Sequence, residues 1–332
     1  MSPKTRPAVP RTAIPKTMHA AAIDRFGGPE VLTMHTLPVP IPTANELLIA
    51  VHTAEVGGWD AEIRDGWSPD GKKPRFPLVL GGGGSGTVAA VGSRVRRFQE
   101  GEPVYAYAWN YRRAGFYAEY VVVPEKGAAK VPSPLDLTHA GAVPIAGITA
   151  LQGIDNALHV KKDERVIIYG ASGGVGVFAL QFAKLRGARV LATASGPDGI
   201  ALMRRLGADA AVDGRDGDIA RAAQEFAPEG VDAILALAGG DALERCIDTL
   251  RPGGRLAYPN GIEPEPKHRR GVRKKSYDGT PGVKEFEQLG RAVEAARLQV
   301  PIATEFALAD AARAHERLAQ GHILGKIVLR VR

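Results

Sequence analysis

Residues Arg165-Val-Ile-Ile-Tyr169 are followed by Gly170-Ala-Ser-Gly-Gly-Val-Gly176 and then by an apolar run from Val177 to Leu185. The pattern predicts a buried strand, a glycine-rich turn and a helix, in the order that a dinucleotide-binding βα unit requires. Ala171 stands where the first glycine of the usual fingerprint would be. A purely structural glycine-rich turn is the alternative interpretation.

In a dinucleotide site each glycine of this turn has a physical purpose. Gly173 and Gly174 would let the backbone come close to a pyrophosphate, and Gly176 would let the helix pack tightly on the strand. The amides at the helix N-terminus would receive the negative charge of the phosphates. The cofactor-binding residues predicted here are Ala171, Ser172, Gly173, Gly174, Val175 and Gly176.

The next predicted strand ends in Val190-Leu-Ala-Thr-Ala-Ser195-Gly, which bears on the choice of coenzyme. An acidic residue about twenty positions after the turn would bind the adenosine ribose of NAD. No carboxylate stands at this strand end, and the nearest one in the sequence is Asp198. Because a carboxylate there would repel a 2′-phosphate, its absence favours NADPH, with Ser195 as a hydrogen-bond donor. Arg204 or Arg205 would add positive charge, or they are solvated cations on a helix face.

The predicted secondary structure changes along the chain. From Met18 to about Leu135, short β-like segments between glycines and prolines predict a β-rich lobe. From Leu137 onward strands alternate with helices, which predicts right-handed βαβ units and a parallel sheet. A last helix, Ala309 to Ala319, precedes a terminal strand, Lys326 to Val331. The expected fold class is α/β, with a doubly wound parallel sheet and a β-rich lobe.

Composition excludes several classes of protein. Hydrophobic residues at 45% and charged residues at 24% of 332 are typical of a soluble globular chain, and no apolar run approaches the length of a membrane-spanning helix. The single cysteine, Cys246, excludes an internal disulfide framework and any zinc site built on several thiolates. It suits a reducing compartment, so we expect a cytoplasmic protein. The helical sequence around Cys246 predicts a buried thiol rather than a reactive one.

Basic residues exceed acidic residues by seven, and the excess is concentrated in two runs. Residues 1–16 carry four cations and four prolines without an acid, which predicts a disordered leader; a cleaved transit peptide is a weaker alternative. Residues 267–275 carry six cations, and the rest of the chain has a net charge of −3. This second run is interpreted as a solvated loop, a contact for an anionic substrate such as an acyl-CoA phosphate, or a nucleic-acid site.

Several further motifs occur in order along the chain. They are Phe26-Gly-Gly-Pro-Glu-Val-Leu32, Gly115-Phe-Tyr-Ala-Glu-Tyr-Val121, Pro144-Ile-Ala-Gly-Ile-Thr149, Leu206-Gly-Ala-Asp209, Leu250-Arg-Pro-Gly-Gly-Arg255 and Gly321-His-Ile-Leu-Gly-Lys-Ile-Val328. With the glycine-rich turn, they make the chain from Met18 onward resemble the zinc-independent quinone oxidoreductase branch of the medium-chain dehydrogenase/reductase (MDR) superfamily.

The resemblance implies a domain organisation. After the leader, residues 1–17, a GroES-like catalytic domain would comprise residues 18–135 and 301–332. Residues 136–300 would form a Rossmann dinucleotide-binding domain, with the catalytic cleft where the two domains meet. The family habit is a homodimer.

The resemblance also shows which ligands are missing. Zinc-dependent relatives hold a catalytic metal with side chains at the positions that match Gly57, Gly82, Gly83 and Ile145. None of these residues can ligate zinc through its side chain, so metal-assisted alcohol oxidation is not expected. The reaction expected instead is hydride delivery to an activated acceptor, such as a quinone, an enone or an enoyl compound. Many quinone reductases carry an Asn where this chain has Gly57, and a Lys or Arg near the position of Pro197.

Aromatic residues supply the candidates for substrate contact. Tyr105, Tyr107, Trp109 and Tyr111 alternate along a predicted strand, so they would share one face, either as a wall for a planar acceptor or as part of the core. By resemblance Tyr107 is the candidate hydroxyl that stabilises or protonates the reduced acceptor, with water as the alternative. The predicted substrate pocket comprises Gly57, Trp59, Gly83 and Trp109. Asp60 and Arg64 also match family positions, and an ion pair between them would explain both.

Other segments are similar to those that approach the nicotinamide in the family. They contain Thr149, Leu237, Ala238 and Asn260, each of which could equally mark ordinary strand or helix termination. Two functions of different classes follow. The first is a metal-free, NADPH-dependent oxidoreductase. The second is a dinucleotide-sensing nucleic-acid-binding protein that keeps the fold without turnover. It is the weaker hypothesis, because the positive charge is restricted to two short runs of the sequence.

Overall fold

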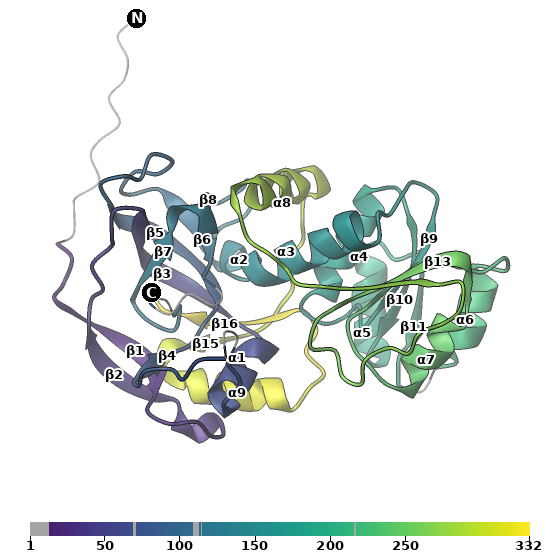
Figure 1. The fold of residues 1–332 in the computed structure, drawn as a ribbon, viewed down its shortest axis with the longest axis horizontal. Coiled ribbons are helices and arrows are strands. Elements are labelled where there is room, and N and C mark those ends of the chain that lie inside the picture. Colours follow the sequence, from purple (N-terminus) through teal and green to yellow (C-terminus); the bar gives the residue numbers. More distant parts are fainter. Residues whose placement is uncertain (1–12, 69–70, 109–112, 114, 216) are drawn as a thin grey trace, which may run out of the picture.

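The computed structural model describes residues 13–68, 71–108, 113, 115–215 and 217–332, which form two lobes side by side (Figure 1). One lobe is built on a parallel sheet with the strand order β11-β10-β9-β12-β13-β14. This is the 3-2-1-4-5-6 order of a doubly wound dinucleotide-binding fold, so the predicted fold class is confirmed here. The strands are β9 (Arg165–Tyr169), β10 (Arg189–Ala194), β11 (Ala210–Asp213), β12 (Val231–Ala236), β13 (Leu250–Pro259) and β14 (Arg273–Tyr277).

Both faces of this sheet are covered because alternate side chains of β9 enter different cores. Val166 and Ile168 pack in a core with apolar residues of α4 (Gly176–Leu185) and α5 (Gly196–Arg205). Ile167 packs on the opposite face with residues of α6 (Ile219–Phe226) and α7 (Asp241–Ile247). The near-continuous apolar sequence of β9 is what a strand buried on two faces needs. Cys246 of α7 lies in the second core, as predicted for a buried thiol, and burial raises its pKa to about 12.

The other lobe is a largely antiparallel barrel-like sheet with the order β15-β16-β3-β5-β6-β8, and β7 pairs with β3. Its last strand comes from the C-terminus, because Ile327 pairs with Val56 and Leu329 with Ala54. Figure 1 shows the yellow C-terminal strand among the blue N-terminal ones. The strands are β3 (Glu46–Val56), β5 (Gly83–Val91), β6 (Pro103–Tyr107), β7 (Tyr120–Pro124), β8 (Ala128–Lys130), β15 (Ile302–Ala307) and β16 (Lys326–Arg330).

A small antiparallel sheet lies beside the barrel, with the order β2-β1-β4. Its strands are β1 (Thr17–Ile23), β2 (Thr33–Pro38) and β4 (Leu78–Val79). The remaining helices are α1 (Gly58–Asp65), α2 (Leu137–Gly141), α3 (Pro144–Gln152), α8 (Val283–Ala296) and α9 (Ala311–Ala319). No helix in the described part of the chain is long and apolar enough to cross a membrane.

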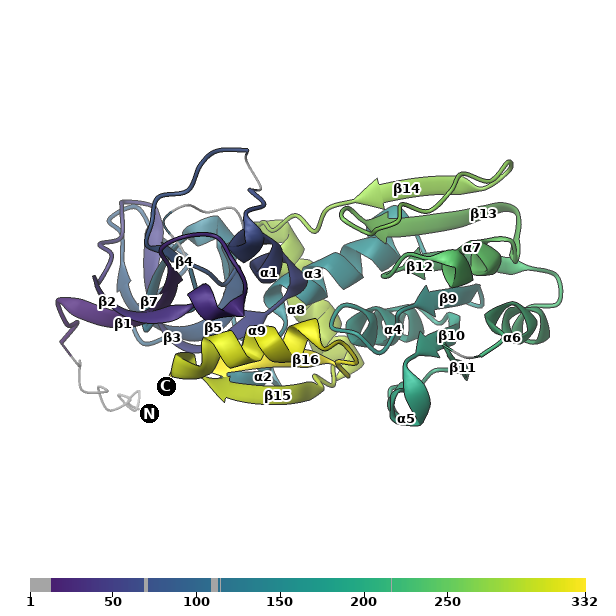
Figure 2. The same ribbon diagram turned by 90° about the horizontal axis from the view of Figure 1, so that it is seen from below.

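One of the hydrophobic cores extends across both lobes. Tyr105 and Tyr107 of β6 belong to the same buried cluster as α3, α4 and α8. The ring of Tyr105 meets that of Phe286 edge to face, at 5.1 Å between centroids. Seen from below, α3 and α8 lie between the barrel and the parallel sheet (Figure 2). The lobes are therefore joined by packed side chains and not by the connecting chain alone.

Residues 1–12 of the expected leader lie outside the described residues. Residues 13–16 are neither strand nor helix, and β1 already begins at Thr17, which pairs with Pro38. The strands of the barrel and of the small sheet fall within residues 17–130 and 302–330, and the six-stranded parallel sheet falls within residues 165–277. We propose domain limits of 18–135 with 301–332, and 136–300, on this distribution.

Candidate active site

A cavity of about 330 Å³ opens between the two lobes. On the side of the parallel sheet it is lined by Gly170, which follows β9, and by Leu237, which follows β12. These adjacent strands are the point where the strand order reverses, and ligands of doubly wound folds bind outside the carboxyl ends of such strands. On the barrel side it is lined by Gly57, Trp59 and residues of β16. The cavity thus lies where both lobes contribute.

The glycine-rich turn is shaped by close backbone contacts. Gly170 has a φ of +80°, which favours glycine, and its N–H donates to Thr193 Oγ1 at 2.8 Å. A Cβ on Gly176 would lie 2.5 Å from Gly170 O and from Ala171 Cα, so only glycine lets α4 start so close to β9. A Cβ on Gly173, by contrast, would meet only Gly170 O, at 3.5 Å, because Gly173 borders the cavity. The turn and the first amides of α4 therefore fit the pyrophosphate of a dinucleotide.

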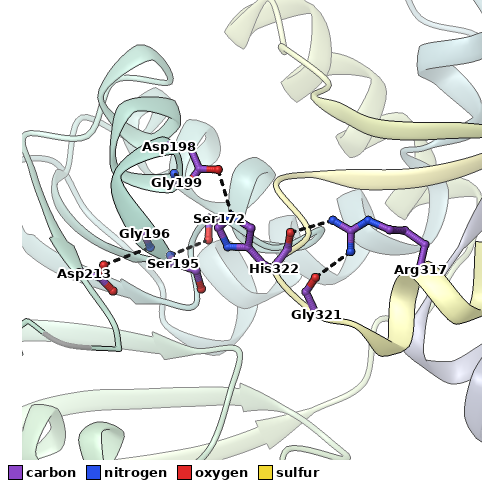
Figure 3. Close-up of polar contacts among 9 residues, drawn as sticks. All are labelled: Ser172, Ser195, Gly196, Asp198, Gly199, Asp213, Arg317, Gly321 and His322. Carbon is purple, nitrogen blue, oxygen red and sulfur yellow. Dashed lines mark hydrogen bonds and ion pairs between the residues drawn. The ribbon is translucent and has the colours of Figure 1, made fainter.

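Ser195, the residue predicted to lie near the adenosine ribose, directly follows the end of β10 (Figure 3). The Gly196 N–H donates to Asp213 Oδ2 at 3.1 Å, and the Arg215 N–H donates to Asp213 Oδ1 at 2.9 Å. Asp198 Oδ2 lies 3.0 Å from His322 Nε2, and this partner lowers the Asp198 pKa. Asp198 and Asp213 therefore both have hydrogen-bond partners within the protein. The sequence pointed only to Asp198 as a carboxylate near Ser195, whereas the fold also brings Asp213 of β11 to this place.

Of the positions that match metal ligands in zinc-dependent relatives, two line the cavity and two lie at the start of β5. Gly57 and Ile145 line the cavity, but their side chains hold no ligand atom. A Cβ on Gly83 would lie 2.5 Å from Glu55 Oε1, so the Glu55 carboxylate fills the space that a side chain at position 83 would need. Within the described residues, no group of three or more His, Cys, Asp or Glu could hold a metal ion. This donor set does not fit a catalytic zinc.

Glu55 forms a buried ion pair at the base of the cleft. Lys326 Nζ lies 2.8 Å from Glu55 Oε2, with the two side chains 7% and 1% exposed. The Ile145 N–H donates to Glu55 Oε1 at 2.9 Å. The pair therefore ties β3 to β16 and to the start of α3. The Lys326 side chain also passes the glycine-rich turn, since its Cδ would lie 3.0 Å from a Cβ on Gly174.

Asp60 is the other buried carboxylate of the cleft. Its Oδ2 accepts the Gly57 N–H at 2.9 Å, and its Oδ1 accepts the Gly82 N–H at 3.2 Å. Burial raises the Asp60 pKa to about 6, and the charge of Glu55 adds to the rise, while the Gly57 amide and Lys326 oppose it. The expected Asp60–Arg64 ion pair is not what holds these residues, because Arg64 pairs with Asp65 at 2.6 Å.

The structure brings together most of the predicted site residues, but not all of them. Those that line the cavity are Thr149, Gly173, Gly174, Val175, Gly176, Leu237 and Asn260, with Gly57 and Trp59. The described lining does not include Ala171, Ser172, Ser195, Ala238 or Gly83. Trp109, the remaining substrate-pocket residue, lies outside the described residues. Ser172 and Ser195 lie together beside the end of β10, where the Ser195 N–H donates to Ser172 Oγ at 3.3 Å.

Tyr107 does not have the position predicted for it. Its side chain is 6% exposed, and its hydroxyl donates to the Gly279 carbonyl at 3.0 Å. Burial raises its pKa, so the hydroxyl keeps its proton. Tyr105 is fully buried on the same face of β6. For these two aromatic residues the structure supports the core-packing interpretation over a wall for the acceptor, and Tyr107 is outside the described cavity lining.

Sequence reasoning missed Glu55 and Lys326, and it assigned Asp60 only a structural ion pair. All three line the cavity. One signal was available for Glu55, since a carboxylate within the apolar run Leu47 to Val56 must find a partner if the strand is buried. That partner lies 271 positions away in the chain, so no local pattern reveals it.

The cationic run 267–275 is partly neutralised within its own lobe. Arg269 contacts Asp248 at 2.7 Å and Glu244 at 3.0 Å, and Lys274 contacts Glu265 at 2.8 Å. The end of the run forms the edge strand β14, whose Tyr277 donates to the Thr149 carbonyl at 3.0 Å. These contacts favour a structural loop and strand over a phosphate-binding face.

Two protein families match parts of the chain. Residues 43–133 match the family described as alcohol dehydrogenase GroES-like domain, and residues 206–329 match the family described as zinc-binding dehydrogenase. Among curated proteins, the quinone oxidoreductase of Sus scrofa is 32% identical over 95% of this chain and 98% of its own length.

Solved structures share the arrangement of both lobes. The quinone oxidoreductase from Coxiella burnetii is 33% identical with a TM-score of 0.86, and the match covers 96% of this chain and 100% of that one. A mycobacterial protein solved in complex with NADPH is 28% identical with a TM-score of 0.82, over 95% of this chain and 100% of that one. The likeness therefore extends over nearly the whole described fold, including the cleft between the lobes.

Proposed function

The chain is an oxidoreductase of the MDR superfamily, and from that premise we propose that it uses NADPH, without a metal, to reduce a quinone, an enone or a similarly activated acceptor. The observation that carries the proposal is that one cleft combines a dinucleotide-type turn with a wall whose described residues form no metal-binding group of side chains. A turn shaped for a dinucleotide faces a barrel wall in which Gly57 stands at a position that matches a metal ligand. Quinone oxidoreductases among the relatives support the acceptor class.

The chemistry that a bound NADPH supplies is hydride donation. The amides of Gly173 to Gly176 would hold its pyrophosphate, and Thr149, Leu237 and Asn260 would border the nicotinamide end of the cleft. Ser195 would donate to the 2′-phosphate. The structure of a mycobacterial relative with NADPH supports this coenzyme. Alignment of the two reactants in a partly closed cleft would provide much of the rate enhancement.

The proposal is tested with the purified full chain. Calorimetry measures the binding of NADPH and NADH separately, and the consumption of NADPH is followed with 1,2-naphthoquinone and with 2-methylcyclohex-2-enone. We expect tighter binding of NADPH, turnover of at least one acceptor, and no loss of activity after dialysis against EDTA. Failure to bind either coenzyme, or turnover that depends on a stoichiometric metal, would contradict the proposal.

A further inference from the structure

We propose that Asp60 is the proton donor of this reduction, and that a buried row of side chains, Tyr117, His315 and Arg64, orients it. The inference rests on the proposed function, because it supplies the proton that must accompany the hydride. It also replaces Tyr107, whose hydroxyl is bound to a carbonyl within the core.

Asp60 lies where an acceptor could reach it. It is on α1, 4% exposed, and it is among the residues that line the cavity. The amides that hold its carboxylate belong to Gly57 and Gly82, which match ligand positions in zinc-dependent relatives. Gly57 lines the cavity, and a Cβ on it would meet only Asp60 Oδ2, at 3.7 Å, so the glycine leaves space beside the carboxyl group. A carbonyl compound in the cleft can therefore come close to the carboxyl group.

The row behind Asp60 has a single consistent direction of hydrogen bonding. Arg64 Nη1 lies 2.9 Å from His315 Nδ1. Because an arginine has no acceptor atom, Arg64 is the donor of this hydrogen bond. His315 therefore carries its proton on Nε2, which donates to the Tyr117 hydroxyl at 3.1 Å. Tyr117 in turn hydrogen-bonds the Asp60 side chain, and its pKa is raised by burial and then by the charge of Asp60.

His315, the middle residue of the row, is uncharged near neutral pH. Burial lowers the His315 pKa to about 4, and the charge of Arg64 lowers it further. Tyr117 and His315 are 0% and 1% exposed, so water does not compete with these bonds. Arg64 does not release its proton in a protein, so the row cannot conduct protons from the surface. It orients the carboxyl group, which recovers its proton from water that enters the cleft.

Charged groups of two neighbouring strands, β3 and β16, act on the proton affinity of Asp60. Glu55 of β3 raises the pKa by repulsion, and Lys326 of β16 lowers it. Tyr117 favours the carboxylate by donating to it. With burial as the largest cause, the pKa is about 6, which leaves a useful acid fraction near neutral pH.

The step balances for an enone. Hydride from NADPH forms a C–H bond at the β-carbon, and the π-electron pair of the C=C bond moves to give an enolate. The Asp60 carboxyl O–H bond then breaks, and its proton forms a C–H bond at the α-carbon. NADP⁺ and a saturated ketone result, and Asp60 is left as a carboxylate until water reprotonates it.

The test compares Asp60→Asn, Tyr117→Phe and Tyr107→Phe with wild type. The matched control is Glu316→Gln, which removes an exposed carboxylate from the helix that carries His315. Asp60→Asn should lower the reduction rate about 10²-fold or more, as expected for loss of a general acid, while the NADPH Kd changes less than about threefold. With 2-methylcyclohex-2-enone the wild type should give one enantiomer of 2-methylcyclohexanone in excess, and Asp60→Asn should give less excess.

The pH profile separates donation from a structural role. Since the acid form is needed, wild-type kcat/KM should fall about tenfold per pH unit above the Asp60 pKa. Tyr117→Phe removes a donor to the carboxylate, so the falling limb should move to higher pH, while Glu316→Gln leaves it in place.

Each outcome decides the question. Activity of Asp60→Asn within about threefold of wild type, or loss of the limb in Tyr107→Phe instead, would overturn the inference. If Asp60→Asn also loses NADPH binding, the pH profile of kcat/KM in Tyr117→Phe is the deciding measurement. A falling limb that does not move from its wild-type position overturns the inference, and one that shifts to higher pH supports it. A wild-type protein that binds NADPH but reduces neither acceptor refutes the proposed function itself, and the inference with it.

Discussion

At the scale of single residues, Gly176 is the position where one methyl group has the largest expected effect on the cofactor turn. A Cβ there would lie 2.5 Å from two backbone atoms. Gly176→Ala should force α4 away from β9, lower NADPH affinity about tenfold or more and cost about 1–3 kcal/mol of stability. Calorimetry and urea unfolding measure both effects.

Gly290 of α8 provides the matched control for that substitution. A Cβ on Gly290 meets no atom within 4 Å, so Gly290→Ala should keep NADPH affinity and stabilise the helix by about 0.5–1 kcal/mol. Equal loss of NADPH affinity in both variants would show that the close contact at Gly176 is not the cause.

Ser195 is the residue on which the coenzyme preference depends. Because Asp198 and Asp213 have partners within the protein, Ser195→Asp would place a new carboxylate at the end of β10. We expect at least a tenfold weaker NADPH affinity, from repulsion of the 2′-phosphate, and a gain for NADH. The ratio of the two Kd values measures the switch, with Ser93→Asp in an exposed turn as control. A ratio unchanged from wild type would place the 2′-phosphate elsewhere.

Asp60 also links stability to pH. Its folded-state pKa of about 6 is above the ordinary value of 3.8, so the folded state binds more protons between these values. Stability from this group is therefore lost as pH rises from about 4 to 6, by roughly 3 kcal/mol. The stability of Asp60→Asn relative to wild type should increase by that order between pH 4 and pH 7. Urea unfolding at both pH values measures it, and a constant difference would contradict the raised pKa.

At the scale of elements, the Glu55–Lys326 pair is the contact that joins β3 and β16 beside the cleft. Lys326→Met would leave the Glu55 carboxylate buried without its counter-ion, which should cost about 3–5 kcal/mol. The double variant Glu55→Gln with Lys326→Met should recover much of that loss. Urea unfolding of the single and double variants measures the coupling. Additive losses would show that the two side chains act independently.

At the scale of the whole molecule, the shared core predicts that the lobes unfold together. Phe286→Ala removes the ring that packs on Tyr105 across the lobes and should cost about 3–5 kcal/mol. All three tryptophans lie in residues 59–109, so their fluorescence reports on the barrel lobe, while far-UV circular dichroism reports on both. The two transitions should coincide in wild type and separate in Phe286→Ala. Separate transitions in wild type would contradict a common core.

The order and type of the elements could be read from local pattern. β9 begins and ends at the predicted residues, Arg165 and Tyr169, because an apolar run between turn residues has one low-energy solution. The second strand was also predicted, and the helix that follows it, α5, begins at Gly196. Pro197 is tolerated there because the first helical turn needs no proline N–H. The glycine-rich turn was found for the same local reason.

The sequence by itself thus determined the strands and the dinucleotide turn, because these depend on neighbours along the chain. Its resemblance to the family indicated the glycines that stand where metal ligands would be. Only the tertiary structure decided which buried charges meet. Glu55 contacts Lys326 of β16, and Asp60 contacts the row of Tyr117, His315 and Arg64, whose histidine lies on α9; both β16 and α9 come from the C-terminal part of the chain. Tyr107 was assigned to the cleft by resemblance to the family, yet the packing of β6 against α3 and α8 buries it. Which face of a strand meets the cleft depends on long-range packing, and local periodicity contains no information about it.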